Sequence, residues 1–103
     1  MTRSLIAARV TVSAAAEAEY LRLVGTLAGL FEARGEHLWV FRSPLRPGLF
    51  LEFREGRART GAVPGTPVTV AEQALDSQIR RIGNYLDGDV LWEEVAMPKQ
   101  TEG

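Results

Sequence analysis

The sequence predicts one α+β domain whose elements follow the order β-α-β-β-α-β. At its centre are two apolar runs, His37–Arg42 and Leu49–Arg54, joined by a segment with two prolines and a glycine, which is typical of a β-hairpin. A long pattern of helical periodicity precedes this hairpin, and a second one follows it. A β-prone run towards each end of the chain completes the series.

The first strand is expected over Leu5–Val12, a β-prone run without glycine or proline. Side chains alternate between the two faces of a strand, so four apolar residues share one face: Ile6, Ala8, Val10 and Val12. The other face is mixed, because Arg9 and Thr11 lie on it beside Leu5 and Ala7. We therefore expect the apolar face to lie in the core.

The first helix is expected to begin after Ser13, a residue type that caps helix N-termini, and to end at Gly35. Apolar residues recur at steps of three and four along one stripe: Tyr20, Leu23, Val24, Leu27, Leu30 and Phe31. Gly25 and Gly29 lie inside this helix, four residues apart. They predict a helix that can approach a sheet closely.

The arms of the hairpin do not alternate cleanly between apolar and polar residues, so we expect strands that are covered in part on both faces. The segment that follows, Arg57–Val68, has two prolines, two glycines and no periodicity. A loop of this length is either a lid over a binding site or a disordered segment, and the residues leave both alternatives open. Its Arg57 and Arg59 are expected to be solvated charges.

The second helix is expected to start at Thr69, because Thr69–Glu72 has the T-x-x-E form of a capping box. Its stripe predicts a helix that continues to Leu86: Ala71, Ala74, Leu75, Gln78, Ile79, Ile82, Tyr85 and Leu86. Asp87-Gly88 should end it, and Val90–Met97 is the expected last strand. Residues 1–97 thus form a single domain, and residues 98–103 form a C-terminal tail.

Right-handed crossovers place both predicted helices on one face of a four-stranded antiparallel sheet, which is the ferredoxin-like arrangement. The opposite face of the sheet then has no helix to cover it. For the third strand we expect Leu49, Leu51 and Phe53 to face the helices. The open face would then carry one aromatic and three charged residues: Phe50, Glu52, Arg54 and Arg9.

The second strand adds either Trp39 and Phe41 or Leu38 and Val40 to the open face. Large apolar groups remain uncovered in both cases, and exposed patches of this kind mark an interface or a ligand site. Among the charged residues, Arg9 is expected to pair either with Glu52 or with a glutamate of the last strand.

The composition excludes several classes of function. The formal net charge is -1, which gives no bulk attraction to nucleic acid or to an anionic membrane. Cysteine is absent and there is one histidine, so disulfides, thiolate nucleophiles and metal sites built on Cys or several His are excluded within one chain. No apolar run has membrane-spanning length. The expected location is the cytoplasm.

RNA-recognition modules share this order of elements. Their third strand carries a basic residue and exposed aromatics, whereas the run Pro47–Phe53 has a glutamate, Glu52, and the chain is not basic. RNA binding is therefore not expected.

Three segments, Ala8–Val24, Pro47-Gly48 and Leu49–Glu55, resemble the dimeric α/β-barrel superfamily, in particular its antibiotic-biosynthesis-monooxygenase-like branch. The resemblance implies a homodimer that packs sheet against sheet and a small apolar pocket. It also implies a monooxygenase-like enzyme without a cofactor, acting on a small aromatic substrate. The histidine pattern of the haem-degrading relatives is absent, because the only histidine is His37.

Three residues are candidates for catalysis: His37 as proton acceptor, Arg9 and Tyr85. Four are candidates for ligand binding: Trp39, Phe50, Glu52 and Arg54. We expect no metal site and no cofactor. Each candidate also has a structural interpretation, because His37 suits a turn, Arg9 with Glu52 and Arg54 suits a salt-bridge layer, and the aromatic residues suit a core. The alternative function is a ligand-binding or assembly domain without catalysis.

Overall fold

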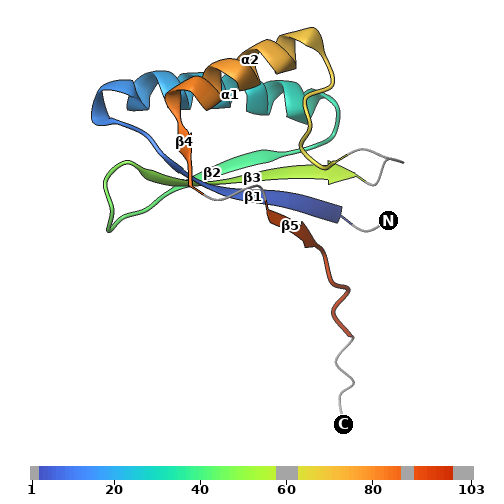
Figure 1. Ribbon diagram of the computed structural model, residues 1–103. Coiled ribbons are helices and arrows are strands. Elements are labelled where there is room, and N and C mark those ends of the chain that lie inside the picture. The colour runs from blue at the N-terminus through green and yellow to red at the C-terminus, as the bar shows by residue number, and fades with distance from the viewer. Residues whose placement is uncertain (1–2, 58–62, 87–89, 99–103) are drawn as a thin grey trace.

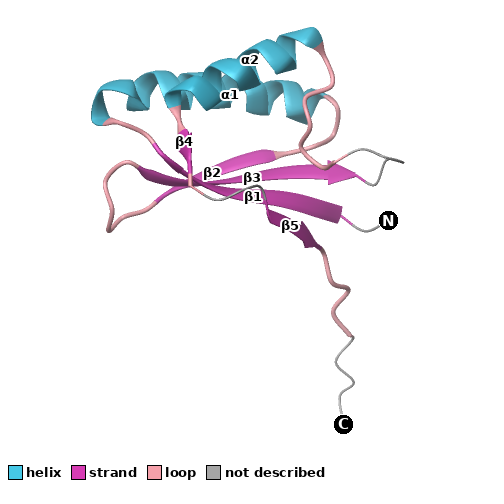
Figure 2. Cartoon of the chain, in the orientation of Figure 1, coloured by secondary structure: helices cyan, strands magenta, loops and turns pink. Residues whose placement is uncertain are grey.

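Two helices lie side by side over one face of an antiparallel sheet, and the described part of the chain places no helix over the other face (Figure 1). The computed structural model describes residues 3–57, 63–86 and 90–98. The elements are β1 (Arg3–Thr11), a 3-10 turn (Ala14–Ala16), α1 (Glu17–Ala33), β2 (Leu38–Arg42), β3 (Leu49–Arg57), α2 (Val70–Ile82), β4 (Asn84–Tyr85) and β5 (Val90–Glu93). The predicted ferredoxin-like α+β fold is confirmed (Figure 2).

The strands follow the order β2-β3-β1-β4, and β5 also pairs with β1. Val10 and Thr11 pair with β4, whereas the segment Ser4–Ala7 pairs with β5. The fourth strand of the predicted sheet is thus divided into two segments along one edge of β1. The expected last strand Val90–Met97 is shorter than predicted, because β5 ends at Glu93.

The predicted stripe of α1 is confirmed, because its buried residues are Tyr20, Leu23, Val24, Leu27 and Phe31. Gly35 ends the helix as expected, with a φ of 80°. The amide of Gly35 donates to the carbonyl of Glu32 and that of Glu36 to Phe31, which is the Schellman pattern. The prediction for Gly25 and Gly29 was wrong: both are exposed and neither lies against the sheet.

The predicted start of α2 is confirmed, since the Thr69 hydroxyl accepts a hydrogen bond of 3.1 Å from the Glu72 amide. The Glu72 carboxylate accepts from the amide of Val68, not of Thr69, at 3.3 Å. The predicted end was wrong. The backbone turns extended at Gly83, so Tyr85 lies in β4 and not on the helix.

The face predicted for the third strand was also wrong. Ile6 pairs with Arg54, Ala8 with Glu52 and Val10 with Phe50. Opposed residues in a ladder share a face, and Ile6, Ala8 and Val10 are buried under the helices as predicted. Phe50, Glu52 and Arg54 are therefore on the helix side, where all three are buried. The open face carries Leu49, Leu51 and Phe53 instead.

Of the predicted loop Arg57–Val68, the residues 58–62, which include Arg59, lie outside the described part of the chain, as do Asp87-Gly88 and residues 99–103. β3 continues to Arg57, three residues beyond the predicted strand. The rest of the loop packs on the domain: a Cβ at Gly56 would meet Pro64, and one at Gly65 would meet the Arg54 side chain. No helix in the described residues is long and apolar enough to cross a membrane.

Candidate functional site

A hollow of about 260 Å³ lies on the open face of the sheet, at the end where β1 begins and β3 ends. Pairing across the sheet assembles it, because Leu5 of β1 is opposed by Trp92 of β5 on one side and by Glu55 of β3 on the other. Seven residues line it: Arg3, Leu5, Trp39, Glu55, Trp92, Glu93 and Glu94. Two indoles thus form apolar walls beside a group of charged residues.

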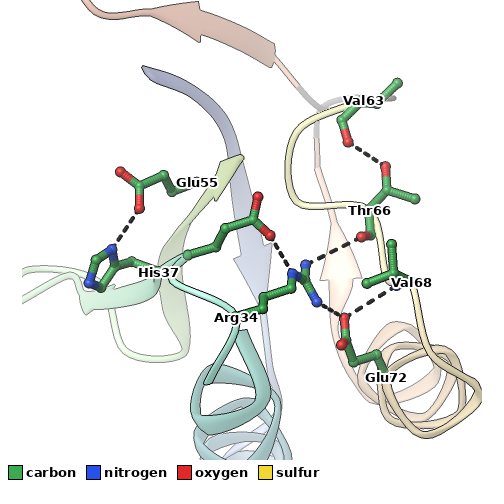
Figure 3. Close-up of polar contacts among 8 residues, drawn as sticks. Arg34, His37, Glu55, Val63, Thr66, Val68 and Glu72 are labelled. Atoms are coloured by element: carbon green, nitrogen blue, oxygen red, sulfur yellow. Dashed lines mark hydrogen bonds and ion pairs between the residues drawn. The ribbon is translucent and has the colours of Figure 1, made fainter. Parts of the chain in front are cut away.

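Glu55, one of the residues that line this hollow, forms a dyad with His37 (Figure 3). His37 Nδ1 lies 2.6 Å from Glu55 Oε1, and the Glu55 amide donates a hydrogen bond of 2.8 Å to the His37 carbonyl. The Glu55 side chain is only 4% exposed, whereas His37 is 49% exposed. A carboxylate at Nδ1 selects the tautomer with the proton on that nitrogen, so Nε2 is left as a proton acceptor.

The imidazole of His37 stacks on the indole of Trp39, with ring centroids 5.2 Å apart and an interplanar angle of 6°. Because Trp39 also lines the hollow, the stack holds the imidazole next to it. This arrangement places a hydrogen-bonded imidazole beside one of the two aromatic walls of the hollow.

Arg3 forms ion pairs with two carboxylates of the hollow, those of Glu55 and Glu94. Its guanidinium lies 3.3 Å from Glu55 Oε2 and donates to Glu94 at 2.9 and 3.3 Å. The hydrogen bonds to Glu94, together with the nearby negative charge, raise the pKa of Arg3, and the same bonds lower the pKa of Glu94. Both groups are therefore charged at neutral pH, and Glu94 is held at the rim.

A second group of polar residues, here called the interior cluster, lies between the helices and the sheet. Its members are Tyr20, Glu52, Arg54, Asp76, Arg80 and Tyr85. The hydroxyls of Tyr20 and Tyr85 donate to Glu52 Oε2 at 2.5 and 2.7 Å, and Arg54 donates to Oε1 at 3.2 Å. Arg54 also lies 2.7 Å from Asp76, which Arg80 holds at 3.1 Å.

Burial sets the protonation of the interior cluster. Desolvation, reinforced by the Glu52 carboxylate, raises the pKa of both Tyr20 and Tyr85. For Arg54 burial lowers the pKa, but the charges of Glu52 and Asp76 outweigh it and the net pKa is raised. The hydroxyls are thus protonated donors and the guanidinium is a cation. Each group is engaged by another of the cluster, as expected of a structural network.

Arg34 fastens the loop after β3 to both helices. Its guanidinium contacts the buried carboxylates of Glu36 and Glu72 and lies 3.5 Å from the carbonyl of Thr66 (Figure 3). Thr66 in turn donates to Val63 at 2.6 Å. The described part of the loop is therefore anchored at the end of α1, away from the face that carries the hollow.

The seven predicted site residues fall in three places. His37 and Trp39 lie together at the hollow, and Glu52, Arg54 and Tyr85 belong to the interior cluster. Arg9 and Phe50 line a second hollow of about 250 Å³ at the hairpin end of the sheet, with Phe41, Arg42, Ser43, Leu49 and Leu51. Of the two partners expected for Arg9, Glu52 was wrong, because the side chains of Arg9 and Glu52 lie on opposite faces of the sheet.

Sequence reasoning missed Glu55, Trp92 and Arg3 as members of the site. The sequence held one signal for Glu55, which is that it follows the arm of the predicted hairpin opposite His37. This signal identifies the pair only when the pairing register of the two strands is known. Trp92 needs the pairing of β5 with β1. Among the described residues no group of three or more His, Cys, Asp or Glu is placed to hold a metal ion.

Comparison with known proteins identifies solved structures with the same fold. No family model matches the sequence, and no curated protein matches it. Two solved structures match over 95% of this chain and 100% of their own: an antibiotic biosynthesis monooxygenase, with a TM-score of 0.64 and 17% identity, and a Bordetella bronchiseptica protein with a similar description, with a TM-score of 0.65 and 16% identity. The chain shares their fold. At these identities the likeness shows the fold alone.

Proposed function

We propose that this protein is a monooxygenase-like enzyme that binds a small aromatic substrate in the hollow between Trp39 and Trp92. His37, oriented by Glu55, accepts a proton from the substrate. The observation that carries the proposal is the 2.6 Å contact between His37 and Glu55 beside a hollow walled by indoles. The names of the two structural neighbours support the same class of reaction.

Deprotonation prepares an aromatic substrate for oxidation, because the anion is richer in electrons than the neutral ring. With no cofactor invoked, the substrate supplies all the electrons that dioxygen takes up. For a phenol, one oxygen atom enters the product at a ring C–H carbon, which becomes a carbonyl of a quinone. The hydrogen of that carbon and the hydrogen of the phenolic hydroxyl leave with the other oxygen atom as water. The residues of this chain bind the ring, hold the base and move the proton.

The proposal includes a homodimer formed through the open face of the sheet. That face exposes large apolar side chains in register: Trp39, Phe41, Val90 and Trp92, which are 38%, 56%, 44% and 57% exposed. Exposed patches of large apolar side chains favour association, and a two-fold axis would bring the same face of two copies together. Such packing would also close the hollow against water, which strengthens the interactions inside it.

Oxygen uptake with a panel of small phenols and hydroquinones tests the enzyme. We expect turnover that falls at least about ten-fold in His37→Gln with little change in KM, because the base acts on the bound substrate. Arg46→Gln, an exposed change in the hairpin connection, is the matched control. Turnover that survives in His37→Gln would remove the base from the mechanism, and absence of turnover with ligand binding intact would favour a binding domain.

Light scattering after size exclusion, over a wide range of dilution, tests the dimer. We expect a mass of two chains that persists on dilution, and dissociation in Phe41→Glu, which puts a charge into the apolar face. Leu45→Glu places the same charge on an 89% exposed loop residue and should leave the mass unchanged. A monomer at all concentrations would contradict the proposed interface.

A further inference from the structure

We propose that the hollow between Trp39 and Trp92 selects a small aromatic molecule that carries an ammonium group. This inference rests on the site of the proposed function but not on its chemistry, and it names the class of ligand that the site takes. Its basis is the combination of two indoles with an excess of carboxylates around one apolar floor.

The charges around the hollow are unbalanced. Glu55 and Glu94 place their carboxylates on this face together with one cationic residue, Arg3, whereas Glu93 follows Trp92 along β5 and its side chain lies on the opposite face. Arg3 lies between Glu55 and Glu94 and contacts both, so a single guanidinium serves two carboxylates. Two carboxylates against one guanidinium leave the hollow with an excess of one negative charge. A cationic ligand relieves this excess, whereas an anionic ligand adds to it.

The indoles favour the same ligand. The π face of tryptophan is negative, and it attracts an ammonium group within about 6 Å of the ring centre. His37 covers one face of the Trp39 indole, while Trp39 and Trp92 both line the hollow. Leu5 forms an apolar floor between the two strands that carry Glu55 and Trp92. The apolar part of the ligand can therefore contact Leu5 and the indoles while its ammonium group approaches the glutamates.

The second hollow gives an internal contrast on the same sheet. It has a similar volume, about 250 Å³, and an apolar lining, but its charged lining residues are Arg9 and Arg42, with no carboxylate among the residues that line it. Apolar character alone therefore does not separate the two hollows. The charge of the lining residues separates them, and the cation preference is expected of the hollow that contains the two tryptophans.

Tryptophan fluorescence reports on the proposed site directly, because the chain has two tryptophans and both line the hollow. The full chain is titrated with benzyltrimethylammonium, benzyl alcohol and phenylacetate, which are a cation, a neutral molecule and an anion of related shape. We expect the cation to bind about ten-fold more tightly than the anion, equivalent to about 1.4 kcal/mol, and less tightly as salt is raised. Equal affinities, or tighter binding of the anion, would overturn the proposal.

Variants locate the preference. Glu94→Gln should abolish most of the discrimination between cation and anion. Glu32→Gln changes the net charge equally on the exposed side of α1 and should preserve it. A preference that persists in Glu94→Gln would show that the hollow is not its source. Turnover is not part of this measurement, so a cation preference without oxygen uptake refutes only the enzyme, and uptake without the preference refutes only this inference.

Discussion

The hydroxyl of Tyr20, on α1, donates a hydrogen bond of 2.5 Å to the carboxylate of Glu52, on β3. Both side chains are inaccessible to solvent or nearly so, with exposures of 0% and 1%. A buried carboxylate is costly unless it is hydrogen-bonded and paired. Tyr20 therefore explains why the sheet can turn Glu52 inward, and the contact fixes the first helix over the centre of the sheet.

The interior cluster predicts a loss of stability at alkaline pH. Because the pKa values of Tyr20 and Tyr85 are raised from 10.0 in the folded chain, the unfolded chain releases these protons first. The two hydroxyls contribute their full stabilisation below about pH 10. This stabilisation is lost as the pH rises towards their raised pKa values in the folded chain. Each hydroxyl should reduce the free energy of unfolding by about 1.4 kcal/mol per pH unit in that range.

Urea unfolding between pH 8 and pH 11 checks this expectation. Tyr20→Phe should be less stable than the wild type at pH 8 by about 1–3 kcal/mol, since Glu52 loses a buried donor, and its stability should fall less steeply above pH 10. An unaltered slope in Tyr20→Phe would mean that this hydroxyl does not couple to folding.

Arg54 is expected to be the residue of the interior cluster whose loss costs most. Its side chain is 4% exposed and lies between the carboxylates of Glu52 and Asp76. Arg54→Met keeps the apolar stem but removes the cation shared by the buried Glu52 and the half-buried Asp76, and the expected cost is about 3–5 kcal/mol of unfolding free energy. Thermal and urea unfolding measure it.

Arg80→Met is the matched comparison. Arg80 also contacts Asp76, at 3.1 Å, but its side chain is 39% exposed. Exposed ion pairs contribute about 0–1 kcal/mol, so this variant should remain close to the wild type. Similar losses in the two variants would argue against burial as the source of the difference.

The same cluster shows where prediction from the sequence stops. The face of β1 and the stripe of α1 were predicted correctly because their apolar residues recur with the period of the element. In β3 the pattern predicted the wrong buried face. Leu49, Leu51 and Phe53 are all apolar, whereas the alternate set that is buried contains Glu52 and Arg54. Their burial depends on partners more than twenty residues away in the sequence, which no local pattern reveals.

The end of α2 was misplaced for a related reason. Tyr85 continues the helical spacing of the stripe by coincidence, but the chain becomes extended at Gly83, with φ -87° and ψ 140°. In β4 the Tyr85 hydroxyl reaches Glu52. At the candidate site, His37 and Trp39 were predicted from their residue types, since His37 is the one histidine of the chain and Trp39 is an aromatic residue of the hairpin. Glu55 and Trp92 join them only through strand register.

Substitution of Gly25 or Gly29 is expected to stabilise the fold, in contrast to the substitutions in the interior cluster. Both lie within α1, and a Cβ at either position would meet no atom within 4 Å. Alanine should therefore add helix propensity without a clash, and each substitution should raise the free energy of unfolding by about 0.8–1.0 kcal/mol. Urea unfolding of Gly25→Ala, Gly29→Ala and the double variant tests this gain and its additivity.

Gly65→Ala is the contrasting variant. Gly65 has a φ of 74°, and a Cβ there would meet the side chain of Arg54. We expect a loss of stability of at least about 1 kcal/mol, because alanine rarely adopts this backbone conformation. A gain at all three glycines would indicate that backbone entropy of the unfolded chain dominates, whatever the local contacts.

The dyad at the hollow leads to a prediction about the state of His37. Imidazole in water favours the proton on Nε2, but a carboxylate 2.6 Å from Nδ1 favours the opposite tautomer. In the neutral form we expect the proton of His37 on Nδ1. Nitrogen-15 NMR can read this directly, because the chain has one histidine and gives one set of imidazole signals.

Glu55→Gln should shift this tautomer equilibrium towards Nε2–H, since a neutral amide stabilises the Nδ1 proton less than a carboxylate does. Glu94→Gln removes a carboxylate that contacts Arg3 but has no contact with His37 in the described structure, and should leave the equilibrium unchanged. The base with Nε2 free is the form that the proposed reaction uses. A Nε2–H tautomer in the wild type would leave the exposed nitrogen protonated, and the dyad would then serve the structure of the hairpin and not proton transfer.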